Sequence, residues 1–206
     1  RDFFVIIVAK EESMRKKLLF LLVVLLFVVS IVPVYAKDKN FYANETVNIK
    51  EDVDETIFAA GNNVKVTGRI DGIGFVAGQN VKVSNSQDYA FIAGKNVKVT
   101  DFAAKDVFAA GEKITFNKAS VRTLFASAGT IEFNGNISKR AYLAGEEVVI
   151  SGTVEGDVVV ASEKLIIEDN AVINGTLKYP EEAEAKVSES ATVANVKTYK
   201  GDKHVS

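Results

Sequence analysis

Apolar and polar positions alternate along most of the chain between about residues 41 and 180, and the alternation is organised into a repeat. Each copy opens with an aromatic residue, continues with two small or apolar residues and a glycine or small substitute, and closes on an apolar-polar-apolar triplet. The copies that begin at Phe58, Phe75 and Phe91 show the pattern most clearly, and successive copies start 17 residues apart at every step but one, which is 16. A fixed period of this length is typical of a solenoid in which each copy forms one coil.

The triplets indicate that the coils consist of strands. Val64 and Val66 flank Lys65, and residues 81–83 and 97–99 repeat this arrangement, which has the period of two that a strand with one buried face requires. Glycine, asparagine and serine separate the apolar runs, where turns need them. The pattern therefore predicts an all-β protein: a three-sided parallel β-helix of about eight coils, with equivalent positions about 4.8 Å apart.

Parallel pairing in register stacks equivalent residues, so we expect the aromatic position to form a ladder in the core. Large side chains over large ones and small over small fill a narrow interior densely, and stacked rings add about 0.5–1.5 kcal/mol per pair. The alternative is an aromatic strip that binds a ligand. The expected core ladder is Phe41, Phe58, Phe75, Phe91, Phe108, Phe125, Tyr142 and Val159, with a parallel ladder of small residues two positions further on, from Ala43 to Ala161.

The residues between these two ladders would then point outward, as an apolar column along the rod. Such a column favours lateral association, unless the corner geometry buries it under a neighbouring turn; both alternatives stay open. On the outward position of the triplets, the last coils also become apolar. The candidate lateral contact consists of Val76, Ile92, Leu143, Val160, Val149 and Ile166.

Basic residues are expected to form two outward ladders. The first is Lys65, Lys82 and Lys98, at the centre of the triplets. The second is a ridge before the aromatic column, made by Lys105, Arg122, Lys139 and Arg140. These charges either keep the sheet faces soluble or form a basic stripe that meets an anionic cell-wall polymer or a lipid surface.

Composition narrows the chemistry further. The 206 residues carry 25 basic and 27 acidic side chains, and a net charge of −2 argues against a nucleic-acid binder driven by bulk charge. There is no cysteine, so disulfides and thiolate sites are excluded. The single histidine, His204, lies in a polar tail, and no histidine base lies on a coil. We therefore predict a protein that is not an enzyme, with no catalytic residues, no cofactor and no metal.

The acidic run at residues 51–55 closes the first coil of the repeat. Terminal coils of a solenoid are expected to be atypical, which favours a solvated edge. A calcium site is the alternative.

The N-terminal region carries a targeting signal. Residues 1–13 have the character of a translated leader, whereas residues 14–36 open with a basic cluster, continue with an apolar run and end at Ala36. This pattern predicts a secretory signal peptide cleaved after Ala36, or alternatively an uncleaved membrane anchor. We expect the β-helix to occupy residues 37–180 outside the cytoplasmic membrane, in the cell envelope, and residues 181–206 to form a cap and polar tail, in which residues 187–193 are either a weak final coil or the cap.

The last coils, residues 150–180, resemble the bactofilins, which are bacterial polymer-forming cytoskeletal proteins. The matching segments are 152–158, 165–167 and 170–175. The resemblance implies a compact β-helix that polymerises with itself end to end without nucleotide and has no catalytic residues. The export signal is a departure from most bactofilins and favours an envelope scaffold. The alternative is an exported binding module that holds an anionic wall polymer or an envelope partner on its basic or apolar face.

Overall fold

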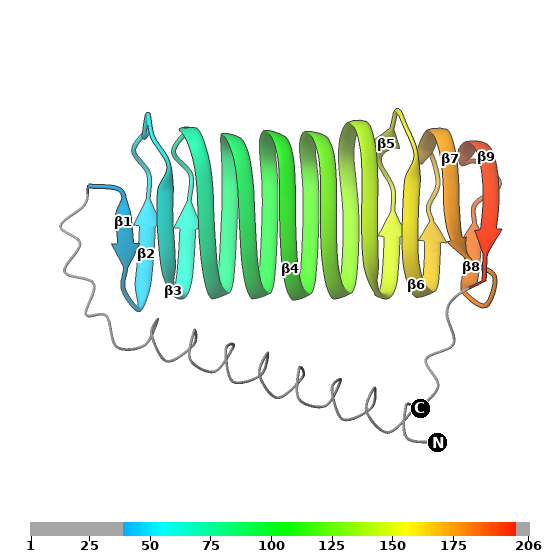
Figure 1. Ribbon diagram of the computed structural model, residues 1–206, viewed down its shortest axis with the longest axis horizontal. Coiled ribbons are helices and arrows are strands. Elements are labelled where there is room, and N and C mark those ends of the chain that lie inside the picture. Colours follow the sequence, from blue (N-terminus) through cyan, green and yellow to red (C-terminus); the bar gives the residue numbers. More distant parts are fainter. Residues whose placement is uncertain (1–38, 201–206) are drawn as a thin grey trace, which may run out of the picture. The chain divides into compact units, whose positions relative to one another are not determined.

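Successive coils of the chain pair through parallel strands along the whole repeat region (Figure 1). The computed structural model describes residues 39–200, which form an all-β parallel solenoid of about nine turns. The expected leader, the signal segment and its apolar helix, and the tail with His204 lie outside the described residues. The strands are β1 (Phe41–Ala43), β2 (Thr46–Ile49), β3 (Ile57–Val66), β4 (Ile70–Ile150), β5 (Thr153–Val154), β6 (Val158–Ile167), β7 (Val172–Pro180), β8 (Glu184–Val187) and β9 (Thr192–Tyr199).

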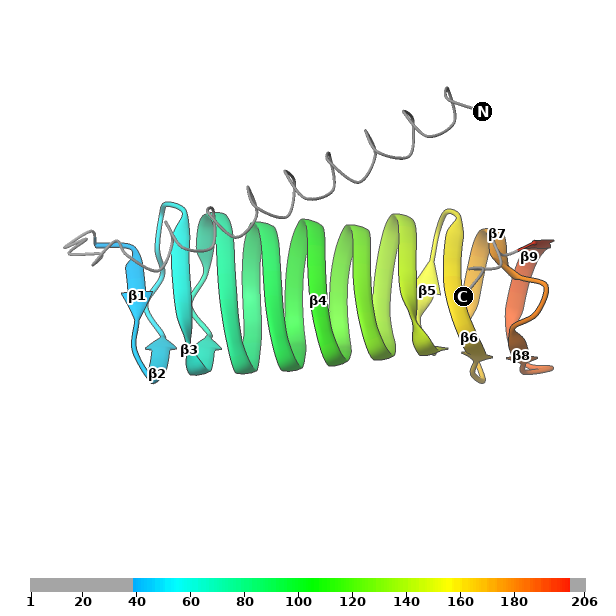
Figure 2. The same ribbon diagram turned by 60° about the horizontal axis from the view of Figure 1, so that its bottom comes forward.

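The register of the strands confirms the 17-residue period. Phe58 pairs with Phe75 and Lys65 with Lys82 between β3 and β4, and Tyr142 pairs with Val159 between β4 and β6. Strand β4 is one continuous ribbon that winds through the middle coils without a break (Figure 2). Residues at equivalent positions of successive coils are therefore neighbours in space wherever the 17-residue period continues.

The last coils are longer than the others. Val158 pairs with Leu177, and Leu165 pairs with Ala185, so the offset between partners grows beyond 17 residues. The chain continues to pair in parallel after Pro180, because β8 pairs with β6 and β9 pairs with β7. Part of the expected cap and tail thus forms a further turn, which is why the solenoid has about nine turns and not eight.

The core is a set of inward columns created by the alternation along each strand. In β3, Ile57, Ala59, Val64 and Val66 are buried, and the residues between them are more exposed. Only two polar side chains are buried among the described residues, Gln87 and Ser162. The interior is otherwise apolar from the first coil to the last, as a parallel stack of coils requires.

Glycines keep the corner after the aromatic segment tight. A Cβ added at Gly111 would lie 2.4 Å from the carbonyl oxygen of Gly94, and one at Gly94 would lie 2.5 Å from that of Gly78. In these two coils backbone approaches backbone too closely for a side chain, whereas Ala128 and Ser162 occupy the equivalent corner in later coils. Within residues 39–200, no helix has the length and apolar character to cross a membrane.

Candidate functional site: an exposed aromatic strip

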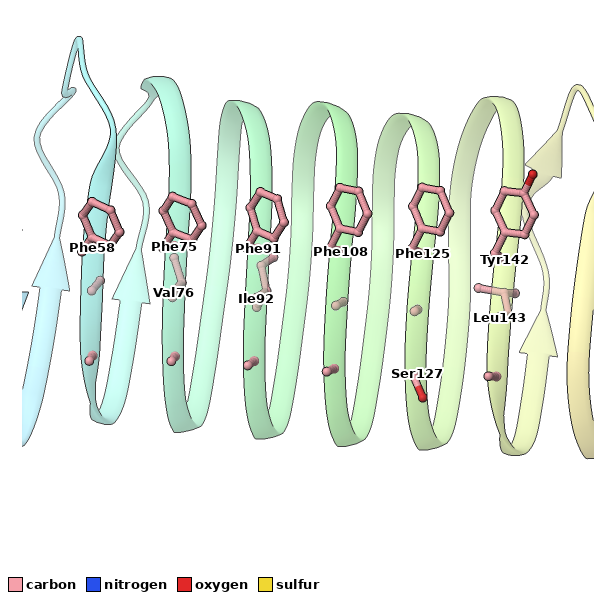
Figure 3. Close-up of a pocket in the computed structure, with 18 of the residues that line it drawn as sticks. Phe58, Phe75, Val76, Phe91, Ile92, Phe108, Phe125, Ser127, Tyr142 and Leu143 are labelled. Carbon is pink, nitrogen blue, oxygen red and sulfur yellow. The ribbon is translucent and has the colours of Figure 1, made fainter. Parts of the chain in front are cut away.

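The aromatic residues form the ladder that the repeat predicts. From Phe58 to Tyr142, successive ring centroids lie 4.8–4.9 Å apart, and most neighbouring rings are parallel within 6°. Phe41 stacks less regularly on Phe58: the two ring centroids lie 6.1 Å apart, and the ring planes are inclined by 28°. Figure 3 shows one ring on each of six successive coils, all on the same side of the ribbon. Offset parallel rings at this spacing attract one another.

The ladder lies on the outside of the solenoid, and the expectation that it fills the core is wrong. Phe58 is 45% exposed, and the other rings are exposed or half-buried. Val159, at the end of the column, is also half-buried. The residues that were expected in the core but lie on the outer surface are Phe41, Phe58, Phe75, Phe91, Phe108, Phe125, Tyr142 and Val159.

The column between the rings and the small residues is correspondingly buried. Ile92 is only 2% exposed. The expectation that this column is an outward strip is therefore wrong for Val76, Ile92, Leu143 and Val160. Val149 and Ile166 lie at a different position and are half-buried beside the polar residues Glu132 and Ser151.

The error has a simple physical cause. Neighbouring residues of a strand face opposite sides, so a shift of one position exchanges the inner and outer sets completely. Both sets are apolar here, so the large size of the rings does not indicate which set is buried. A better signal is the apolar residue just before several of the rings, such as Ile57, Val107 and Leu124, which continues the inward alternation.

Side-chain volumes within single coils provide a second signal for the inward set. In two coils where the residue after the ring is only alanine, at Ala109 and Ala126, a phenylalanine is buried elsewhere, at Phe116 and Phe133. In these two coils large and small inward residues compensate one another, as a closely packed interior demands. The ring position shows no such compensation.

The rings and the small residues beside them form one open apolar surface, which we call the aromatic strip. Its ring column runs from Phe41 to Tyr142. Its shelf is the outward column of small residues Ala60, Ala77, Ala93, Ala110, Ser127, Ala144 and Ala161. The two columns and the residues between them line a groove of about 840 Å³. Among the lining residues within 39–200, the only polar side-chain atoms are the hydroxyls of Ser127 and Tyr142.

The lysine ladder lies on another outward face. Lys65, Lys82 and Lys98 are all exposed, and none forms an ion pair with another residue of the described range. Beside them, the side-chain amide of Asn80 donates to Asn63 at 3.1 Å, and that of Asn96 donates to Asn80 at 3.1 Å. The first of the two predicted basic features is thus a row of unpaired positive charges next to a row of linked amides.

The second basic ridge is partly neutralised. Lys105 Nζ lies 3.0 Å from Asp88 Oδ1, and Arg122 Nε donates to Asp106 Oδ1 at 3.0 Å. The Arg122 hydrogen bond is the main reason that the pKa of Asp106 lies below its usual value. The remaining members, Lys139 and Arg140, are exposed and have no ion pair within residues 39–200.

The acidic run at residues 51–55 is tied to the next coil by one arginine. Arg69 lies 3.6 Å from Asp52 and 3.4 Å from Asp54, and its guanidinium also contacts Asp71. These contacts fit the solvated edge better than the calcium alternative. In the part of the chain that the structure describes, no group of three or more potential metal ligands gathers.

Comparisons with known proteins yield no match to a family model, to a curated protein or to a solved structure. The class of the protein is therefore defined by its fold: it is a parallel β-solenoid, an architecture compatible with a structural repeat scaffold.

Proposed function

We propose that this protein is a self-assembling structural scaffold of the bacterial cell envelope, whose solenoids join end to end without nucleotide. The observation that carries the proposal is an open apolar core at the C-terminal tip. The similarity of residues 150–180 to bactofilins supports it. The same proposal includes a three-sided cross-section, an apolar N-terminal helix and export directed by residues 14–36.

The last coil continues the inward columns but leaves them uncovered. Val187 pairs with Ile167, and Val196 pairs with Leu177, so both valines extend columns that are buried one coil earlier. They are nevertheless 41% and 50% exposed, because no further coil of the described chain lies over them. Covering this apolar end would stabilise the tip through the hydrophobic effect.

Backbone groups at both ends can take part in the same contact. Within the described residues, β1 and β2 pair only with β3, and β8 and β9 pair only with the coil before them. The outer edge of a terminal strand carries free N–H and C=O groups, which can pair with another chain. In a three-sided solenoid each tip would present three such rows.

A joint that continues the coil register would place the C-terminal tip of one molecule on the N-terminal coil of the next. Val187 would then adjoin Ile49, which occupies the same inward column at the other end. In the column of Val196 the N-terminal position is Asn40, one coil before Ile57. Apolar contact and backbone pairing would act together, and neither requires a bound nucleotide.

The test is a charge placed at the open tip. In a Val187→Glu variant we expect filaments to be lost in electron microscopy, because a carboxylate would have to be buried at the joint. The matched control is Lys186→Glu, since Lys186 is its exposed neighbour on the outward face. Light scattering that shows only monomers for the unmodified protein at high concentration would contradict the proposal.

Salt provides an independent test of the joint. The N-terminal coil carries the acidic run 51–55, and the last coil carries Glu181, Glu182, Glu184 and Glu189, so like charges would approach one another. Raising the salt concentration shortens the screening length. We therefore expect a lower critical concentration for assembly at about 0.5 M salt than at about 0.05 M.

A second candidate function is a binding module for an anionic wall polymer, favoured by the unpaired lysine ladder. Reversal of Lys65, Lys82 and Lys98 to glutamate would then abolish retention on the immobilised polymer. The control with the same change of charge is reversal of three lysines that already face carboxylates, namely Lys95, Lys113 and Lys164. Equal retention of both triple variants would exclude the ladder as the binding surface.

A further inference from the structure

The aromatic strip lies along the side of the rod, so an end-to-end joint leaves it exposed. Six parallel rings and the shelf beside them form a continuous apolar surface along successive coils (Figure 3). Soluble monomers rarely expose apolar patches of more than a few hundred Å² without a partner. We propose that a second copy of this chain packs on the aromatic strip, so that end-to-end filaments associate side by side in pairs; this inference rests on the proposed function.

The chemistry of the strip selects an apolar partner. In the part of the chain that the structure describes, its lining contains no charged side chain, and its only polar side-chain atoms are the hydroxyls of Ser127 and Tyr142. A site for a polar ligand needs hydrogen-bonding or charged groups that fix the ligand's orientation. Along the middle coils the strip offers only ring and methyl surfaces.

The spacing of the strip favours a second copy over other apolar partners. The rings repeat every 4.8–4.9 Å over five consecutive steps from Phe58 to Tyr142. A surface with a different repeat would drift out of register along this length. A second copy has the same rise per coil, so equivalent contacts can form at every level.

The profile of the strip is complementary to itself. On each coil an outward ring and an outward small residue lie two positions apart, as Phe91 and Ala93 do. A two-fold axis parallel to the rod places the ring column of one copy over the shelf of the other, and the reverse contact forms simultaneously. A two-fold axis across the rod would instead set rings on rings and leave a void between the shelves.

The size of the strip explains why we expect pairing between filaments and not between single rods. Successive coils lie about 4.8 Å apart, so the regular rings span about 24 Å, which is too short a strip for two rods to bury the ~1,200 Å² in total that is typical of stable complexes. Two separate rods would therefore pair weakly. In a filament the same contact repeats along the polymer, and linked weak contacts reinforce one another.

The first test places charges on the shelf. In an Ala93→Lys and Ala110→Lys double variant we expect single filaments in place of pairs, because two ammonium groups would be buried against rings. The matched control is Ala103→Lys with Ser120→Lys, since both residues are exposed on a different part of the same coils. Negative-stain microscopy measures the filament width. Unpaired wild-type filaments, or pairs that persist in the shelf variant, overturn the inference.

The second test measures the accessibility of a single introduced thiol, which is possible because the chain contains no cysteine. The thiol of an Ala93→Cys variant should react with maleimide at least tenfold more slowly in assembled than in monomeric protein, whereas an Ala103→Cys thiol should react equally in both. Protection of the residue 93 thiol in monomers overturns the inference, because a lipid or another segment would then cover the strip.

The two proposals can fail separately. If no filament forms, the proposed function fails, and sedimentation equilibrium at high protein concentration then decides the lateral contact. Dimers that the shelf variant loses and the control variant keeps support pairing through the strip. Monomers at all concentrations overturn it.

Discussion

The solenoid contains two groups of aromatic residues that differ in almost every physical respect. The strip rings are parallel, evenly spaced and at least partly exposed, whereas Phe116 is 1% exposed and meets Phe133 at a 53° tilt with a centroid distance of 5.9 Å. The strip rings repeat because the register repeats. The buried rings are confined to single coils and occupy the inward columns, where Phe102, Phe116 and Phe133 lie among aliphatic residues. Ring stacking and core packing are therefore separate properties of this fold.

The largest expected effect comes from a buried ring. Phe116→Ala should lower the free energy of unfolding by about 3–5 kcal/mol, because it removes a full aromatic side chain from a dense interior and leaves a cavity. Urea titration followed by circular dichroism measures the change. A loss no greater than that of a strip ring would contradict the assignment of Phe116 to the core.

The buried amide of Gln87 provides the next test of the inward set. Neither Nε2 nor Oε1 of Gln87 has a hydrogen-bond partner among residues 39–200, and the side chain occupies the space that a Cβ at Gly74 would need. Gln87→Met keeps the shape and removes the unsatisfied groups, so it should raise the free energy of unfolding by about 1–3 kcal/mol. The control is Gln79→Met, at an exposed position. Destabilisation by the Gln87 substitution would show that the amide has a partner.

A strip ring should matter less for the stability of the monomer. Phe108 stacks on both Phe91 and Phe125, at 4.8 Å each. Phe108→Ala should cost about 1–2 kcal/mol, chiefly through the two lost ring contacts. Phe108→Leu, which keeps apolar bulk without stacking, should recover part of this loss in the same urea titration. Full recovery would mean that stacking contributes little.

The smallest expected effect comes from an ion pair at the edge of the strip. The pKa of Asp106 is lowered mainly by the Arg122 hydrogen bond, so its stabilising contribution is present above the pKa of the unfolded chain and is lost as the pH falls through the folded value. Asp106→Asn should lower stability by up to about 1 kcal/mol at pH 7. The difference from wild type should shrink below about pH 4.

The control for this pair is Glu112→Gln. Glu112 lies 3.6 Å from Lys95, and both side chains are well exposed, so this substitution should change stability less at pH 7. A difference between Asp106→Asn and wild type that stays constant from pH 7 to pH 3 would exclude the carboxylate as its source.

Much of the fold could be predicted from the repeat. The spacing of Phe58, Phe75 and Phe91 predicts the coils, the parallel pairing and the ring ladder, and the register and ring distances confirm them. The sequence indicates the extra turn at residues 181–199 only as a weak final coil or cap, because its offsets are longer and its inward residues, such as Ala185 and Val187, are small or few. The repeat predicts the candidate site as a ladder of rings. The ladder exists, but it lies on the outer side of the coil and not on the expected inner side.

The stacking partner of each residue follows from the sequence alone, because a constant period aligns equivalent positions whenever coils pair in parallel. The sequence could not determine which of two apolar sets faces the interior, since Phe91 and Ile92 would each pass as core residues. Only the closed coil decided this: its inner perimeter accommodates compensating volumes such as Ala109 with Phe116, and it leaves the uniform column of rings on the outside.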